Sequence, residues 1–276
     1  MGVGCQQPPE NRVEIMSLTR LFISAEIQSG LQLNLDEDQA RYIGRVLRLR
    51  TGDQLTVFNG RGGEFCATAQ SIGKDAAVLL VGEQFNTKTE SSLKVHLVQG
   101  ISRGERMDFV VQKATELGVK RITPVASEYG VVKLDINRAA KRRDHWQSVA
   151  ESACEQSGRT RPPLIDPPAD LNAWFGNRTK EPDTDLILRP GAANALAAVP
   201  TPVTKVCLLI GPEGGFSNSE YDDAELAGFN SVSLGPRILR TETAAIAAIT
   251  IVQSRWGDLG PDISPGTGEI SGLSLD

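Results

Sequence analysis

The sequence contains no run of about 18 apolar residues, the length that a membrane-spanning helix requires. Its first residues, MGVGCQQPPENRVE, lack the apolar segment of a secretory signal, and Gln6 stands where a myristoylation motif has Ser or Thr. We therefore expect residues 1–16 to form a disordered tail and the protein to work in the cytoplasm.

Residues that bind metals are few. The four cysteines form no C-x-x-C pair, and the two histidines, His96 and His145, stand far apart in the sequence. The cysteines are therefore expected to be reduced thiols, mostly in the core, and a zinc site is not expected.

The net charge of −5 is acidic, but the charge is unevenly distributed. Residues 91–161 hold 13 Lys and Arg against 8 Asp and Glu, whereas residues 162–276 hold 7 against 15. Because a nucleic acid meets a local surface and not a sum, a basic middle segment permits RNA binding without demonstrating it.

The 276 residues suit one large or two moderate domains. In the first part, residues 20–24, 54–60, 62–70 and 76–85 have strand patterns, and residues 36–49 have a helical pattern with Arg41, Arg45 and Arg48 on one face. Short strands with a single helix predict a small β-barrel.

A polar segment, residues 86–92, is the best linker, and strands and helices alternate after it. Such alternation predicts an α/β domain with a mostly parallel sheet covered on both faces. Residues 261–276 read as a second disordered tail. The predicted strands are 93–100, 121–127, 185–188, 205–211 and 231–235, and the predicted helices are 103–117, 137–156, 218–228 and 241–256.

The segment LLIGPEGGFSNSE, residues 208–220, is a strand followed by a loop and a helix start. Gly211, Gly214 and Gly215 remove side chains, so the backbone can approach a ligand, and Ser217 with Glu220 forms a capping box. The segment is neither a P-loop nor a G-x-G-x-x-G fingerprint. A tight turn with no ligand is the alternative.

Two other predicted strands end in Gly/Pro loops, in DLILRPGAAN and SLGPRILRTETAAIAAI. Ligands in open α/β sheets sit at the carboxyl ends of strands, so the three loops could form one pocket. The second loop carries Arg237 and Arg240, for which surface salt bridges are the alternative. The helix that follows is apolar nearly all round, which indicates burial in a core or in a subunit interface.

Taken together, RYIGRVLRLRTGD, SRGERMDFVVQKATELGV, ESACEQSGR, LLIGPEGGFSNSE and LGPRILRTETA resemble the RsmE family of small-subunit rRNA uridine-N3 methyltransferases, which belong to the SPOUT class. The resemblance covers about residues 20–260. It implies a PUA-like RNA-binding β-barrel at residues 17–88 and a SPOUT domain with a trefoil knot at residues 91–260.

The resemblance also implies S-adenosylmethionine as cofactor, no metal, an obligate homodimer, and small-subunit rRNA or the assembled 30S subunit as partner. Arg189 departs from the family pattern, in which a histidine is expected. The implied cofactor-binding residues are Leu188, Arg189, Pro190, Ile210, Gly211, Pro212, Glu213, Gly214, Gly215, Leu234, Gly235, Ile238, Leu239, Thr241 and Thr243.

Within this framework, Arg240 is expected to stabilise the uracil anion, and Glu242 is a candidate proton acceptor. Methylation of another RNA position, such as a ribose 2′-hydroxyl, and a non-catalytic role in RNA binding or assembly are the alternatives. Solvated surface charge is the alternative for the cations. The expected RNA-binding residues are Arg20, Arg45, Arg48, Arg103, Arg106, Lys113, Arg159 and Arg161.

Overall fold

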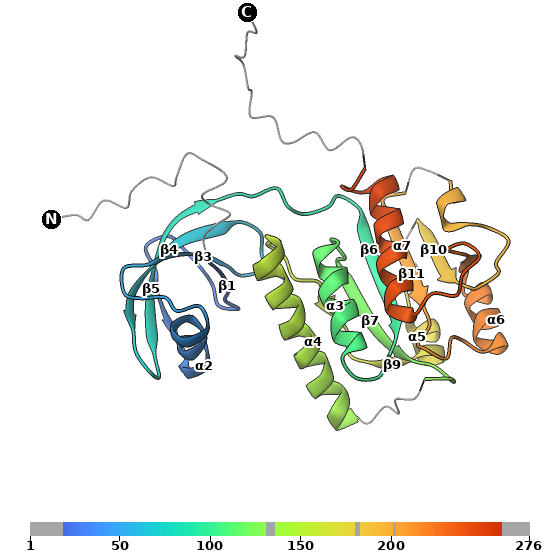
Figure 1. Cartoon of the computed structure of the whole chain (residues 1–276), viewed down its shortest axis with the longest axis horizontal. Coiled ribbons are helices and arrows are strands. Elements are labelled where there is room, and N and C mark those ends of the chain that lie inside the picture. Colours follow the sequence, from blue (N-terminus) through green and yellow to red (C-terminus); the bar gives the residue numbers. More distant parts are fainter. Residues whose placement is uncertain (1–18, 131–135, 180–182, 201–202, 261–276) are drawn as a thin grey trace, which may run out of the picture. The chain divides into compact units, whose positions relative to one another are not determined.

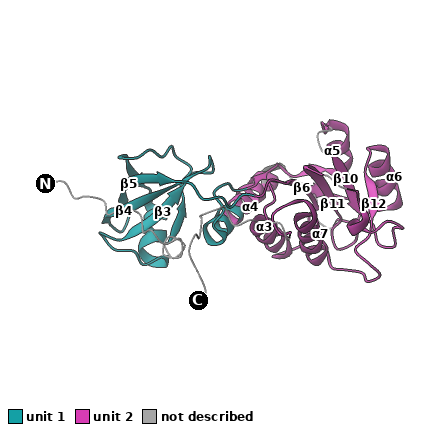
Figure 2. Cartoon of the chain, turned by 90° about the horizontal axis from the view of Figure 1, so that it is seen from above, with its two compact units in different colours: residues 1–90, 150–162 teal, residues 91–149, 163–276 magenta. Residues whose placement is uncertain are grey.

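The computed structural model describes residues 19–130, 136–179, 183–200 and 203–260, so both predicted tails lie outside the described residues. The chain divides into two compact units (Figure 2). Unit 1 comprises residues 1–90 with 150–162, and unit 2 comprises residues 91–149 with 163–276. The long helix α4, Ile136–Ser157, contributes residues to both units.

Unit 1 holds a curled five-stranded sheet in the order β1-β3-β4-β5-β2, and register shifts interrupt the long β4–β5 pair. Alternate side chains such as Leu55, Val57 and Leu79 fill its core. The predicted barrel-like sheet is therefore present. Its strands are β1 Arg20–Phe22, β2 Gln32–Leu35, β3 Gln54–Phe58, β4 Glu64–Ile72 and β5 Ala77–Phe85.

The predicted helix over residues 36–49 is shorter and less regular than expected. It consists of α2, Glu37–Arg41, and a π-helical turn η1, Tyr42–Val46. Arg48 lies beyond the turn with φ of 57°, a left-handed conformation, so the prediction that it shares a helix face with Arg41 and Arg45 is wrong. The cause is the early end of the regular helix at Arg41, after which the chain enters the π-helical turn that contains Gly44.

Unit 2 holds a parallel seven-stranded sheet among its described residues, with β12-β10-β11-β6-β7-β8 in order and β9 also paired to β7. The predicted parallel sheet is therefore confirmed. Its strands are β6 Lys94–Gly100, β7 Arg121–Ala126, β8 Leu164–Ile165, β9 Ala169–Asp170, β10 Thr184–Leu188, β11 Lys205–Ile210 and β12 Asn230–Val232.

Helices cover both faces of this sheet, with α3 and α7 on one side and α5 and α6 on the other (Figures 1 and 2). Cys207 and Leu209 of β11 pack with Phe216 and Tyr221 on the α6 side, and the alternate Leu208 is buried as well. Burial on both faces explains why β11 is a continuous apolar run. The helices are α3 Arg106–Glu116, α5 Leu171–Asn177, α6 Asn218–Leu226, α7 Thr241–Trp256 and the short 3-10 helix η2 Leu196–Ala198.

Several short elements were not predicted, namely β2, β8, β9 and α5. The alternating residues 31–35, LQLNL, are the signal that could have revealed β2, whereas β8 and β9 are too short to show a hydrophobic period. The predicted capping box is confirmed: Ser217 accepts from the backbone of Glu220, whose side chain accepts from the backbone of Ser217. No helix of the described residues is long and apolar enough to cross a membrane. The trefoil knot stays a prediction.

Candidate cofactor and catalytic site at the strand ends

The three predicted loops lie at one edge of the unit 2 sheet. They follow β10, β11 and β12, which are parallel and stand side by side in the order β12-β10-β11. Parallel neighbours end at the same edge, which is where open α/β sheets bind ligands. Tertiary structure thus brings together segments that are separated by about 20 residues or more in the chain.

Each of the three loops contains one glycine whose backbone is left open. Gly191, Gly215 and Gly235 have φ of 76°, 71° and 94°, and nothing lies within 4 Å of where a Cβ atom would stand. A side chain would be strained at such φ values, and its absence lets a ligand approach the backbone closely, although the Gly215 N–H itself donates to the Pro212 carbonyl at 2.9 Å. Exposed backbone at three neighbouring strand ends suits a ligand with many polar edges.

At Gly211 and Gly214, glycine is needed for a different reason: neighbouring atoms leave little room for a side chain. A Cβ on Gly211 would stand 3.1 Å from Cα of Gly215, and one on Gly214 would stand 2.9 Å from Cβ of Tyr129. The room that we predicted for a ligand at these two positions is therefore taken by the chain itself. Of the three glycines in this loop, only Gly215 faces open space.

Glu213, the one carboxylate of this loop, binds the start of α3. Its Oε1 accepts from Arg106 Nη1 at 2.6 Å and from the Arg103 backbone N–H at 3.1 Å. Burial favours a higher pKa for Glu213, but its own backbone N–H, the Arg106 guanidinium and the Arg103 N–H outweigh it and lower the pKa. The carboxylate therefore stays ionised and ties the loop to residues 103–106.

Gln99 is a buried residue of this site that the sequence motifs did not reveal. Its Nε2 donates to Thr241 Oγ1 at 2.9 Å and to the Gly100 carbonyl at 3.1 Å, and it reaches the Gly211 carbonyl at 3.5 Å. Thr241 Oγ1 in turn donates to that Gly211 carbonyl at 2.6 Å. Gln99 thus links the end of β6, the loop after β11 and the first residue of α7.

The start of α7 presents the predicted catalytic pair. Arg240 is the exposed N-cap residue, and its side chain has no hydrogen bond or ion pair within the described residues. Oε2 of Glu242 is buried and also lacks a partner there. Thr241 is buried, Thr243 is exposed, and Ile238 is 87% exposed although apolar. The site therefore offers a cation and a carboxylate oxygen without partners, together with an exposed apolar side chain. Such groups are suited to binding a ligand.

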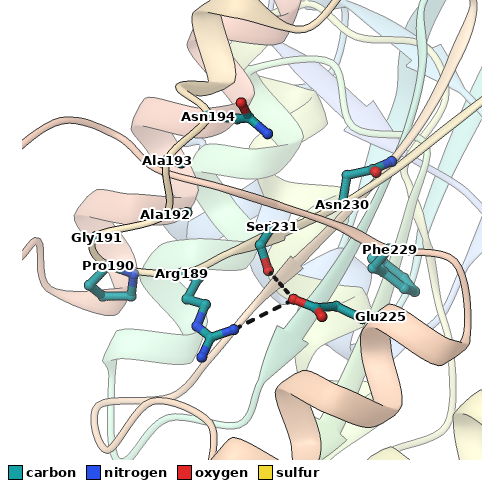
Figure 3. Close-up of a pocket in the computed structure, with 10 residues that line it drawn as sticks. All are labelled: Arg189, Pro190, Gly191, Ala192, Ala193, Asn194, Glu225, Phe229, Asn230 and Ser231. Atoms are coloured by element: carbon teal, nitrogen blue, oxygen red, sulfur yellow. Dashed lines mark hydrogen bonds and ion pairs between the residues drawn. The ribbon is translucent and has the colours of Figure 1, made fainter.

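Arg189, in the loop after β10, contacts α6. Its guanidinium lies 4.6 Å from the Tyr221 ring centroid and 3.5 Å from Glu225 Oε1, and Glu225 also accepts from Ser231 (Figure 3). Arg189, Glu225 and Ser231 border an open cavity of about 780 Å³. Of the predicted cofactor residues, Arg189 and Pro190 line this cavity, whereas Leu188 and Ile210 are buried strand ends and Leu234 and Leu239 are half-buried.

The predicted RNA-binding cations fall into groups with different surroundings. Arg159 is buried and paired with Glu90, and Arg20, with 12% of its side chain exposed, is paired with Glu64, so both charges are already neutralised by carboxylates. Arg45, Arg48, Arg103 and Arg161 are exposed. Arg106 is bound to Glu213, and Lys113 is half-buried and bound to Glu116.

Among the described residues, no group of three or more His, Cys, Asp or Glu side chains could hold a metal ion. The available groups are open backbone, a free guanidinium and a partly buried carboxylate. Such groups suit recognition of a nucleoside-like ligand and stabilisation of a developing anion.

Two family models match the chain. Residues 89–253, more than half of the chain, match a model described as an RNA methyltransferase domain. Residues 35–81 match a model described as an RNA methyltransferase PUA domain.

Several curated relatives carry the name ribosomal RNA small subunit methyltransferase E. The relative from Buchnera aphidicola (subsp. Schizaphis graminum) is 37% identical over 242 residues, which cover 88% of this chain and 98% of the relative. The Bacillus subtilis relative is 30% identical over 248 residues, which cover 85% and 96%.

Two similar solved structures contain the predicted cofactor. The ribosomal RNA small subunit methyltransferase E of Neisseria gonorrhoeae, bound to S-adenosyl methionine, superimposes with a TM-score of 0.81 at 38% identity over 87% of this chain and 99% of that one. A Legionella pneumophila protein in complex with bound SAM gives 0.83 at 39% identity, again over 87% and 99%.

Proposed function

The chain belongs to the RNA methyltransferase family that includes the ribosomal RNA small subunit methyltransferase E proteins, and from this premise we propose that it methylates N3 of a uridine in small-subunit (16S) rRNA. This proposal rests chiefly on one observation: the two domain matches, and a relative named ribosomal RNA small subunit methyltransferase E, span nearly all of the folded chain. The predicted family, the enzyme class and S-adenosylmethionine as cofactor are confirmed. The target atom rests on the family resemblance.

The three loops after β10, β11 and β12 would hold the cofactor. The open backbone beside Gly191, Gly215 and Gly235 supports contacts to the adenine and ribose edges, and exposed Ile238 supports an apolar contact to the adenine ring. When bound, S-adenosylmethionine supplies an electrophilic methyl group. The protein must hold that carbon within about 3–3.5 Å of the attacking nitrogen, and in line with it.

Arg240 and Glu242 would act on the uridine. Loss of the N3 proton places negative charge on O2 and O4 of the base, and an exposed, unpaired guanidinium can stabilise that anion. The buried and unpartnered Oε2 of Glu242 is suited to accept the proton, directly or through a water molecule. Both groups stand at the first turn of α7, so one element positions them together.

The RNA partner is small-subunit rRNA, free or within the assembled 30S subunit. Because N3 takes part in base pairing, the uridine must be unpaired, and we expect it to be flipped out of its helix. Arg45, Arg48, Arg103 and Arg161 are the predicted RNA-binding cations that remain exposed. Arg106 is half exposed, so it can reach a phosphate only in competition with Glu213.

The enzyme is proposed to act as a cytoplasmic homodimer in which α7 contributes to the subunit interface near the cofactor. The outward side of this helix is still apolar, since Ile246, Ala247 and Ile251 are only half-buried in the single chain. Such a surface is typical of a helix that another subunit covers. Light scattering of the purified protein gives the oligomeric state.

Nucleoside mass spectrometry tests this function. Ribosomal RNA from a strain that lacks the gene should have lost 3-methyluridine, and the purified protein should restore it with S-adenosylmethionine. Restoration of a different methylated nucleoside, such as a 2′-O-methylated one, would contradict the proposed target. Binding of S-adenosylmethionine in calorimetry without any transfer to rRNA would instead indicate a non-catalytic assembly factor.

A further inference from the structure

A second cavity of unit 2 lies at the opposite end of the strands from the cofactor loops. It has a volume of about 350 Å³ and is lined by residues near the starts of β6 and β7, by the segment after β8 and by the end of α5. The cofactor loops follow the carboxyl ends of β10, β11 and β12, whereas His96 of this cavity pairs in register with Cys207, near the start of β11. The cavity is therefore separate from the cofactor site.

Hydrogen bonds fix the tautomer of His96. Thr123 Oγ1 donates its single proton to Asp166, so in the 2.7 Å contact between that hydroxyl and His96 Nε2 the imidazole must be the donor. Arg121 Nε donates to the same Asp166 oxygen at 2.7 Å, which keeps this carboxylate an acceptor. Nδ1 of the neutral imidazole is then an acceptor, and no described residue donates a hydrogen bond to it.

The charged groups at this cavity balance one another. Arg121 is paired with Asp166. Arg178, whose side chain is 9% exposed, is paired with Asp185 at 2.6 Å. Burial, reinforced by the two guanidinium groups and opposed by Asp166, lowers the pKa of His96 to about 4, so the imidazole is neutral at pH 7. Two cations and two carboxylates leave no net charge, and the lining contains no other charged side chain, so neither an anion nor a cation is favoured.

The remaining walls of the cavity are aromatic, apolar and amide groups. The half-buried indole of Trp174 stands edge-on to His96 with ring centroids 6.1 Å apart, and Pro167 and Ala169 add apolar surface. Asn177 contributes an exposed amide, which can both donate and accept. Apolar walls with a few polar groups, in a volume of roughly 300–1,000 Å³, are typical of sites for small molecules.

We propose that this cavity binds a neutral nitrogen heterocycle of the nucleobase type, as a free base or nucleoside. An N–H of the ligand would donate to His96 Nδ1, a neighbouring carbonyl or ring nitrogen would accept from the Asn177 amide, and the ring would pack against Trp174. Both arginines of the lining are already paired with carboxylates, so the phosphates of a nucleotide would gain little there. This site goes beyond the proposed function and does not depend on it.

Nuclear magnetic resonance of the imidazole nitrogens tests this site directly, because the chain has only two histidines, His96 and His145. The full-length protein, without a histidine tag, is labelled at these nitrogens and saturated with S-adenosylmethionine, so that nucleosides do not occupy the cofactor loops. His145→Phe assigns the two sets of signals. His96 should show the Nε2–H tautomer at pH 7. Uracil or adenosine should shift its Nδ1 signal, whereas phosphate and acetate should not.

A matched ligand and matched variants separate the proposed contacts from general effects. Uracil with methyl groups on both ring nitrogens keeps the ring and the carbonyls but has no N–H, so it should bind much more weakly than uracil. In calorimetry, His96→Phe keeps an aromatic ring but loses Nδ1, and it should weaken nucleoside binding about three- to ten-fold, as expected for one neutral hydrogen bond. Asn177→Ala, at an exposed position, should have a similar effect. His145→Phe, on α4, should bind like the parent.

An Nδ1–H tautomer of His96, or an Nδ1 signal that no nucleobase or nucleoside shifts, would overturn the proposed site. A shift caused by phosphate or acetate, or equal binding of the methylated uracil, would overturn the proposed class of ligand. These measurements involve neither RNA nor methyl transfer, so they give the same answer whether or not the protein methylates rRNA. Absence of methylation would contradict the proposed function and not this site.

Discussion

Arg159, which belongs to residues 150–162 of unit 1, contrasts with the arginines at the strand ends of unit 2. In the first region, Arg159 is 3% exposed at its side chain and binds Glu90 through Nε and Nη2. In the second region, Arg237 and Arg240 are exposed and their side chains have no partner within the described residues. All three arginines belong to segments rich in family motifs, yet their surroundings differ completely.

This contrast separates two uses of the same side chain. A buried guanidinium must be paired, because an isolated charge in the interior is costly. The Arg159–Glu90 pair therefore anchors residues 150–162 within unit 1. An exposed guanidinium without a carboxylate keeps its charge available, which is what an anionic transition state or a phosphate requires.

The largest expected effect is the loss of stability when the buried arginine of this comparison, Arg159, is replaced. Arg159→Ala removes one partner of a buried ion pair, which typically costs about 3–5 kcal/mol of unfolding free energy. All three tryptophans lie in unit 2, so hydrogen exchange of β3, β4 and β5 amides is a better measurement than tryptophan fluorescence. Arg161→Ala, exposed and two residues away, should change stability by about 0.5 kcal/mol or less. Equal protection in both variants would contradict the anchoring role.

Arg240→Ala probes the exposed member and should reduce methyl transfer about 100- to 1,000-fold, which corresponds to roughly 3–4 kcal/mol of lost transition-state stabilisation. Calorimetry should show that S-adenosylmethionine still binds. Arg237→Ala, a charge removed from the same exposed loop, is the matched control and should reduce turnover far less. Parent-like turnover in Arg240→Ala would rule out its proposed role.

Gln99→Leu tests whether the position of exposed Arg240 depends on the hydrogen bonds that buried Gln99 makes to the neighbouring Thr241. The change removes the donor to Thr241 and Gly211, so the affinity for S-adenosylmethionine and the turnover should both fall, by about 1–3 kcal/mol in total. Gln253 is equally buried, near the other end of α7, where it donates to the Leu117 carbonyl. Gln253→Leu should lower stability without changing cofactor affinity. If both variants bind the cofactor like the parent, Gln99 has no positioning role.

Arg189→Ala should have the smallest effect, about 0.5–1 kcal/mol of stability, because its guanidinium is 36% exposed and its ion pair with Glu225 is long. Burial raises the pKa of Tyr221, and the positive charge of Arg189 partly offsets this. Removal of that charge should therefore raise the Tyr221 pKa further, which ultraviolet titration of the phenol can follow. A lowered pKa would contradict the observed stacking.

The sequence predicted the elements that carry strong local signals. The helix expected at residues 241–256 is found as Thr241–Trp256, and Gly118 and Gly158, which closely follow the predicted helices 103–117 and 137–156, have φ of 83° and 80°. The three strand-end loops were also predicted, because each combines an apolar run with Gly and Pro. The break of the first helix before Arg48 was not, since π-helical turns have no comparable sequence signal.

The order of the longer strands and helices follows from periodicity and caps, and the family motifs indicated the cofactor, because these signals are local properties of the chain. Which arginines are neutralised and which glycines face open space depends on contacts that exist only in the folded chain. Glu90 stands 69 residues from Arg159, and Glu213 stands 107 residues from Arg106. Ion pairing and burial depend on such distant neighbours, so a motif can name an arginine without revealing whether its charge is free.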